Sequence, residues 1–161
     1  MKPAQDRRRR FRPLGLFLLL TLGVGALASA ISEPALANWY AGLRQPAFAP
    51  AIWLLPPVWT TLYVVMAAAA WRVWQTGGNR AAPMTAFGAQ LALGLIWNLL
   101  FFALHHLAFA LAAQALLDAA LLMTLILFWN RDRGAGALMA LVLGWNGFAT
   151  LLGHQLWRLN S

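Results

Sequence analysis

Tryptophan is the residue type in this sequence with the most chemistry to offer. The 161 residues include nine tryptophans, two tyrosines and nine phenylalanines. An indole ring presents a flat π face that can stack on a planar ligand, and its N–H needs a partner or a cavity when the ring is buried. Tryptophan also gathers at membrane–water interfaces, where the ring lies among lipid headgroups. The depth of each tryptophan in the fold therefore decides which role it has.

Few titratable side chains compete with the aromatic residues for a chemical role. Asp118 lies in the middle of an apolar run, with Gln114 one helical turn before it, so both should face the inside of a helix bundle. Such an acid either makes a hydrogen bond between helices or handles a ligand or a proton. The histidines, His105, His106 and His154, lie at a short break or near the end of an apolar run, where axial haem ligation is not expected. The sequence has no cysteine and only four scattered acids, so it predicts no metal site and no conventional catalytic constellation.

The composition is that of an integral membrane protein. Apolar residues make up 61% of the chain and charged residues 10%, whereas a soluble domain carries about a quarter charged residues. The net charge of +8 is concentrated at the amino terminus, because six of the twelve Lys and Arg lie within residues 1–12. A basic cluster beside an apolar run is typical of a cytoplasmic membrane face. The expected partner is therefore a lipid bilayer, not a nucleic acid.

Charge-free runs mark five membrane-spanning helices of about 20 residues each. They cover approximately residues 14–31, 57–75, 84–104, 107–130 and 136–157. Four prolines between residues 45 and 57 argue against a continuous helix there, so segment 32–56 is expected to be a long loop. The sequence thus predicts an all-α integral membrane protein. Its single domain, residues 14–160, is a bundle of five transmembrane helices that follows a basic tail, residues 1–13.

Charge distribution also predicts the topology. Ten Lys and Arg fall in the tail and in the turns after the second and fourth spans, and only Arg44 and Arg158 fall on the other side. The positive-inside rule then puts the amino terminus in the cytoplasm, and the carboxy terminus and loop 32–56 outside. The first span has an alternative interpretation. Basic Arg7 to Arg10, an apolar run and Ala28-Ser29-Ala30 also fit a cleaved signal peptide, and these residues alone do not decide between the two.

The order of the aromatic residues resembles that of the TspO/translocator protein family, the tryptophan-rich sensory proteins. The matching positions are Trp39 to Pro46, Pro50 with Trp53, Pro57 to Tyr63, Gln90-Leu91, Trp97 with Phe101-Phe102, Trp145 with Phe148-Ala149, and Trp157 to Asn160. They follow the family's order over residues 36–160. The chain departs from the family pattern at Phe48, Ala51, Leu55, Gly94, Leu141-Val142 and Gly153, so it resembles a divergent, bacterial-type member. The resemblance favours a first helix that is retained.

The resemblance implies a pocket for porphyrins or drug-like polyaromatic ligands among the five helices, beneath loop 32–56. The ligand-binding residues that it implies are Tyr40 and Trp53 in that lid, and Trp59, Tyr63, Trp97, Asn98, Phe101, Trp145 and Ala149 in the helices. A porphyrin or haem would be a ligand of this pocket and not a resident cofactor. The other tryptophans, Trp39, Trp71, Trp74, Trp129 and Trp157, lie near span ends and fit an interfacial belt together with Trp53.

The implied function is that of a sensor, regulator or carrier of tetrapyrroles. The family is also linked to light- and oxygen-dependent porphyrin breakdown, in which Trp59 and Trp145 would take part. Family members form homodimers through the third helix, where Gly88 and Ala92 have the small-x-x-x-small spacing that lets helices approach closely. Two alternatives stay open: a small-molecule transporter or channel subunit that uses Asp118, and a structural membrane partner without a ligand.

Overall fold

The computed structural model describes the backbone of residues 3–161 and the side chains from Phe11 onward. The side chains of Lys2 and of Arg7 to Arg10, on which the predicted basic cluster depends, lie outside the described part. Within it the chain forms five long helices and no strand, and each helix is long and apolar enough to cross a membrane. The helices are α1 (Pro3–Ala35), α2 (Leu55–Gln75), α3 (Ala81–Asn98), α4 (Leu107–Trp129) and α5 (Arg133–Asn160). The predicted fold class, a five-helix membrane protein, is confirmed.

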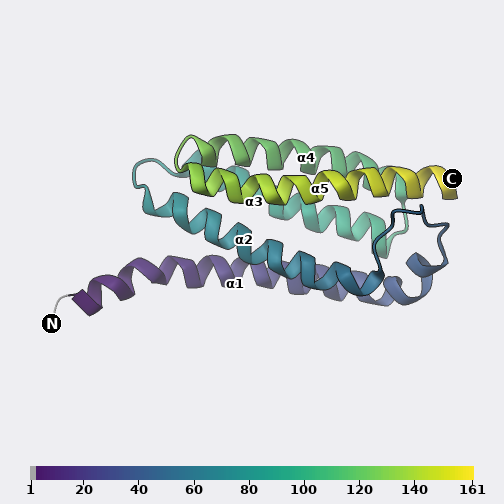
Figure 1. Ribbon diagram of the computed structural model, residues 1–161, viewed down its shortest axis with the longest axis horizontal. Coiled ribbons are helices and arrows are strands. Elements are labelled where there is room, and N and C mark those ends of the chain that lie inside the picture. Colours follow the sequence, from purple (N-terminus) through teal and green to yellow (C-terminus); the bar gives the residue numbers. More distant parts are fainter. Residues whose placement is uncertain (1–2) are drawn as a thin grey trace.

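The helices form a closed ring in the order α1, α2, α5, α4, α3. Helix α1 packs on α2, α2 on α5, α5 on α4 and α4 on α3, and α3 returns to α1. Figure 1 shows α1 and α2 side by side, with α3, α4 and α5 above α2 in this view. The two chain ends lie at opposite ends of the bundle. An odd number of spans requires this separation of the termini. Because the ring is closed, all five helices can contribute to one central space.

Helix α1 begins earlier than the predicted first span. Its 33 residues extend over roughly 50 Å at 1.5 Å per residue, against about 30 Å for the hydrocarbon core of a bilayer. Residues 3–13, predicted as a tail, are therefore helical and continue α1 beyond the apolar run that starts at Leu14. At its other end α1 reaches Ala35, so the first residues of the predicted loop are helical as well.

Interdigitated side chains close one end of the bundle. The Phe87 and Phe128 rings stack with centroids 5.9 Å apart, and Phe17 meets the edge of Phe87 at 6.2 Å. Small residues of α2 make room for them, and the fully buried side chains here include Ala67, Ala69, Ala70, Val73 and Met139. In lipid the hydrophobic effect does not drive helices together. Close packing of small and aromatic side chains is therefore the main attraction between them.

Two turns are fastened together at this same end. Asp132 caps the start of α5 by accepting a hydrogen bond from the Ala135 N–H at 2.7 Å. The Arg72 guanidinium at the end of α2 donates to both carboxylate oxygens of Asp132, at 2.8 and 3.1 Å. The hydrogen bond from Arg72 is the main reason that the pKa of Asp132 lies below its ordinary value. Arg131 donates to the backbone oxygens of Gly77 and Asn79, which ties the α4–α5 turn to the α2–α3 turn.

The long connection from α1 to α2 crosses the opposite end. A π-helical turn, Leu36–Tyr40, extends α1, and a 3-10 turn, Ile52–Leu54, precedes α2. The connection is pinned to the end of α5, because the Arg44 N–H donates to Asn160 Oδ1 at 2.9 Å and Asn160 Nδ2 donates to the Arg44 carbonyl at 3.2 Å. Helix α3 also ends in a π-helical turn, Leu99–Ala103, followed by His105 with φ +56°. The predicted break at His105-His106 is where the chain reverses.

Candidate functional site

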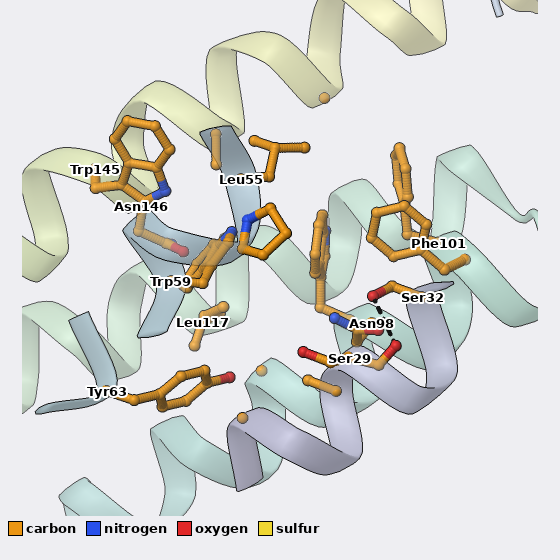
Figure 2. A pocket seen from close by; sticks show the side chains of 18 of the residues that line it. Ser29, Ser32, Leu55, Trp59, Tyr63, Asn98, Phe101, Leu117, Trp145 and Asn146 are labelled. Atoms are coloured by element: carbon orange, nitrogen blue, oxygen red, sulfur yellow. Dashed lines mark hydrogen bonds between the residues drawn. The ribbon is translucent and has the colours of Figure 1, made fainter. Parts of the chain in front are cut away.

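A cavity of about 390 Å³ lies inside the ring of helices, on the side nearer the α1–α2 connection. All five helices line it. Eight of the nine predicted ligand-binding residues border this one space: Tyr40, Trp59, Tyr63, Trp97, Asn98, Phe101, Trp145 and Ala149. Figure 2 shows Trp59 and Tyr63 from α2, Asn98 and Phe101 from the α3 segment, and Trp145 from α5 converging on it. Residues separated by more than 100 positions in the chain therefore form a single site.

The ninth predicted residue, Trp53, does not border the cavity. It lies in the 3-10 turn before α2, and its side chain is 74% exposed. The turn places the ring on the outside of the bundle, whereas Leu55 and Pro56, which follow it directly, reach the cavity wall. The position of Trp53 suits the interfacial belt that its sequence position also predicted.

Aromatic rings form the walls of the cavity. On α2 the Trp59 and Tyr63 rings lie 6.3 Å apart with 39° between their planes. On the α3 side the Trp97 and Phe101 rings are stacked at 5.2 Å with 20° between planes. On α5 the Trp145 ring lies 5.3 Å from Phe148. Aromatic rings from three helices thus border the same space, and a planar ligand could contact more than one of them at once.

A few polar atoms interrupt this apolar lining. Gln90 Oε1, Asn98 Oδ1 and Trp145 Nε1 are buried, and no hydrogen-bond partner for them exists among the described residues. A buried polar atom without a partner costs about 1 to 3 kcal/mol, so such atoms are rare unless they have a role. An apolar pocket with a small number of polar groups is the usual form of a small-molecule site, and 390 Å³ lies within the usual range for such pockets, roughly 300 to 1,000 Å³.

Several lining residues were not predicted as ligand-binding. Helix α1 contributes Ser29, Ser32 and Glu33, which are three and four positions apart and so share one helix face. That spacing was a readable signal at the polar end of the first span. Gln90 belonged to the family motif but was not assigned a role. Asn146 was not assigned a role either, although a polar side chain in the middle of the span 136–157 was a readable signal; only the fold shows its partner on another helix.

Asp118 lies behind the cavity wall and not on it. Its two carboxyl oxygens accept hydrogen bonds from α5: Asn146 Nδ2 donates to Oδ1 at 2.7 Å, and Thr150 Oγ1 donates to Oδ2 at 2.8 Å. Of these three residues only Asn146 borders the cavity. Gln114 is buried, as its shared face with Asp118 predicted. The acid therefore makes the interhelical hydrogen bonds that were one of the two interpretations of its position.

The histidines have positions away from the cavity lining. The His105 ring stacks on Trp39 with centroids 4.2 Å apart, His106 meets Phe109, and His154 lies near Trp157. Trp39 in turn packs edge-on against Phe101 at 5.4 Å. The histidine at the α3–α4 turn thus helps to hold the end of α1 over the cavity.

Comparison with known proteins agrees with this arrangement. The sequence model of the TspO/MBR family matches residues 17–158. The chain belongs to the TspO/MBR family. It is 31% identical over 145 residues to the tryptophan-rich protein TspO of Archaeoglobus fulgidus, which covers 89% of this chain and 94% of that protein. It is 35% identical over 147 residues to the tryptophan-rich sensory protein of Cereibacter sphaeroides, covering 91% of both chains.

The similarity extends to animals. Over 127 residues the chain is 33% identical to the human translocator protein, covering 76% of this chain and 75% of the human one. The family match includes every residue that lines the cavity, since the lining runs from Gly25 to Leu156. The family match therefore covers the whole cavity lining and the connection above it.

Proposed function

We propose that this TspO/MBR protein binds planar, largely apolar ligands of the porphyrin type in its central cavity and acts as their sensor, regulator or carrier. The observation that carries the proposal is the convergence of aromatic walls from α2, α3 and α5 on one cavity. A tetrapyrrole is a broad, flat π system, which gains most from contact with several rings while lipid is excluded. The name of the Cereibacter sphaeroides relative, a sensory protein, and that of the human relative, a translocator protein, support this range of roles.

A cavity-filling substitution tests the proposal. Gly94 borders the cavity, and a Cβ atom added there would meet no other heavy atom within 4 Å. Gly94→Phe should therefore fold and fill the ligand space. Gly144, on the outer surface of α5, also has no heavy atom within 4 Å of an added Cβ, and it does not border the cavity. Gly144→Phe is thus a matched control.

The measurement is a titration of protoporphyrin into the full-length protein in lipid nanodiscs, followed by tryptophan quenching. The wild type and Gly144→Phe should show the same saturable quenching, and Gly94→Phe should show at least a tenfold weaker affinity. Equal affinities of the two phenylalanine variants would mean that porphyrin binds elsewhere, and the proposal would have to be abandoned.

The transporter alternative that relies on Asp118 has less support. Asp118 does not border the cavity, and both of its oxygens accept hydrogen bonds from α5. A coupling group has to meet the ligand or the ion that it couples. We therefore assign Asp118 to the support of the cavity wall.

We also propose that the amino terminus is cytoplasmic, as the positive-inside rule predicts from the distribution of Lys and Arg.

We further propose that two copies associate through α3. Gly88 and Ala92 lie on an exposed face of α3, and an added Cβ at Gly88 would meet no heavy atom of the same chain. This face of small residues lets another helix approach closely. Gly88→Leu should lower the yield of cysteine cross-links introduced along α3, whereas Gly144→Leu should leave it unchanged. Cross-linking that is indifferent to Gly88→Leu would exclude this interface.

A further inference from the structure

Asn146 differs from the other polar residues of the cavity because a residue outside the cavity, Asp118, fixes its side chain by a hydrogen bond. Its Nδ2 donates to Asp118 Oδ1 at 2.7 Å. The second carboxyl oxygen of Asp118 accepts from Thr150 Oγ1 at 2.8 Å, and Thr150 Oγ1 also lies 3.0 Å from the backbone oxygen of Asn146. These three residues tie α4 to α5 at the depth of the cavity. Asn146 itself is 2% exposed.

The hydrogen bond to Asp118 decides which end of the Asn146 amide faces the ligand. An amide has a donating nitrogen and an accepting oxygen that can exchange places by rotation of the side chain. Here Nδ2 donates to Asp118 Oδ1, an oxygen that can only accept while it carries no proton, so the amide oxygen points the other way. Figure 2 shows this oxygen directed toward Trp59, on the cavity side. Within the described residues, no group donates a hydrogen bond to it.

The other amides of the cavity are free to turn. Asn98 has no hydrogen bond that fixes its side chain within the described residues, and its Oδ1 is buried without a partner. Gln90 Nε2 bonds only to Met66 Sδ at 3.6 Å, and a thioether sulfur is a weak acceptor. Asn98 and Gln90 can therefore offer either a donor or an acceptor to a ligand. Asn146 can offer only an acceptor.

We propose that Asp118 and Thr150 lock Asn146 as a hydrogen-bond acceptor in the cavity wall, and that this selects planar ligands with an N–H or O–H donor on the edge that faces α5. The inference rests on the proposed function, because it requires that planar ligands occupy the cavity. Asn146 is the specificity-determining residue, and Asp118 is a positioning residue that acts through it. A ligand of the same shape without a donor would bury the Asn146 oxygen unpaired, which is the strongest way in which a pocket discriminates between isosteres.

Carbazole and dibenzofuran are the probes for this selection. They have the same three-ring shape, but carbazole carries an N–H where dibenzofuran has an oxygen. Each is titrated by calorimetry into the full-length protein in nanodiscs, with the heat of partition into empty nanodiscs subtracted. The wild type should bind carbazole at least about tenfold more tightly than dibenzofuran, which is the lower end of what one neutral hydrogen bond and one relieved unpaired acceptor contribute together.

Variants separate the positioning role from a general effect on folding. Asn146→Leu removes the acceptor, and Asp118→Leu removes the carboxylate that holds the Asn146 amide. Each substitution should reduce the carbazole preference to less than about threefold. The double variant should reduce it no further, because both act on the same interaction. Asp118→Asn can present either its oxygen or its nitrogen to Asn146, so its carbazole preference should lie between that of the wild type and that of Asp118→Leu. Gln114→Leu is the matched control, because Gln114 is a buried polar residue one turn away on α4 that does not border the cavity. It should leave the preference unchanged.

The outcomes distinguish this inference from the proposed function. The inference is overturned if the wild type binds the two probes equally, if it binds neither while protoporphyrin binds, or if Asp118→Leu keeps the full carbazole preference. A carbazole preference that is smaller in Asp118→Asn than in Asp118→Leu would also reject the positioning role. If neither the probes nor protoporphyrin bind to the wild type, the proposed function fails together with the inference. A protoporphyrin titration on the same samples decides between these cases.

Discussion

Replacing Trp145 with alanine tests whether the α5 wall of the cavity contacts the ligand. The indole borders the cavity, lies 5.3 Å from Phe148, and has a buried Nε1 with no partner among the described residues. Stacking of one aromatic side chain on a nucleic-acid base contributes about 1 to 3 kcal/mol by alanine substitution, and a tetrapyrrole offers a comparable π face. The expected loss of porphyrin affinity is therefore roughly tenfold to hundredfold. Trp59→Ala, on the α2 wall, should have a loss of similar size.

A phenylalanine at the same position separates the ring from the N–H. Trp145→Phe keeps a π face, so it should cost less affinity than Trp145→Ala, and any remaining loss measures the contribution of the Nε1 donor. Both substitutions remove the indole, which is much more readily oxidised than a benzene ring, so both should remove its contribution to light-dependent porphyrin breakdown. Trp145→Phe should thus separate the two readouts, because it keeps most of the binding and loses that contribution.

The assay has to follow the ligand and not the protein. Each variant lacks one of the tryptophans that report quenching, so the shift of the main porphyrin absorption band is the better signal. Trp74→Ala and Trp129→Ala are the controls, since these rings are 37% and 46% exposed and do not border the cavity. Trp53→Ala should behave like the controls, because its ring is on the outside of the bundle.

Equal losses of affinity in the cavity variants and the controls would refute the reasoning. That result would mean that any lost tryptophan destabilises the bundle and that the cavity walls have no special role. A large effect of Trp53→Ala alone would instead show that the connection closes further over a bound ligand, and that the Trp53 ring then becomes part of the site.

Three further predictions concern other parts of the molecule. The folded-state pKa of Asp132 lies below its ordinary value of 3.8. The stability that its bond to Arg72 contributes is therefore fully present above pH 3.8 and is lost as the pH falls through the lower, folded-state pKa. Asp132→Asn should flatten the dependence of thermal unfolding on pH below about 4. A Cβ at Gly25 would lie 2.7 Å from Tyr63 Cδ2, so Gly25→Ala should displace the Tyr63 ring and weaken porphyrin binding, whereas unchanged binding would show that this ring contributes nothing. A reporter fused after Ser161 should be active only outside the cytoplasm, and cytoplasmic activity there would reverse the proposed orientation.

Most of the architecture could be predicted from the sequence. The scarcity of charge determined the membrane environment, and the charge-free runs located the helices. The predicted span 57–75 lies within α2, Leu55–Gln75, and the span 107–130 extends one residue past α4, Leu107–Trp129. The first span was the least accurate, because a helix that continues beyond the bilayer has no hydropathy signal to mark its true start. The predicted loop began too early because Ser32, Glu33 and Pro34 interrupt the apolar run, although the chain stays helical as far as Tyr40.

The candidate site could be predicted only in part, and mostly through family resemblance. The pairs Trp59 with Tyr63 and Asn98 with Phe101 share a helix face by spacing alone, and each pair does border the cavity. Spacing does not say whether that face points inward. Trp53 had the same motif support as Trp59 and lies outside, because a 3-10 turn at its position directs the ring away from the bundle.

The sequence by itself therefore determined the class of protein, the number of helices and the local faces. The tertiary structure alone decided the ring order α1, α2, α5, α4, α3, the position of the cavity, and the meeting of Asp118 with Asn146 and Thr150 across two helices. The physical reason is the solvent. In water the polar face of a helix identifies its outer side, but in lipid both the buried and the exposed faces are apolar, so periodicity does not tell inside from outside. Only the packing of the helices against one another settles which side chains face the ligand.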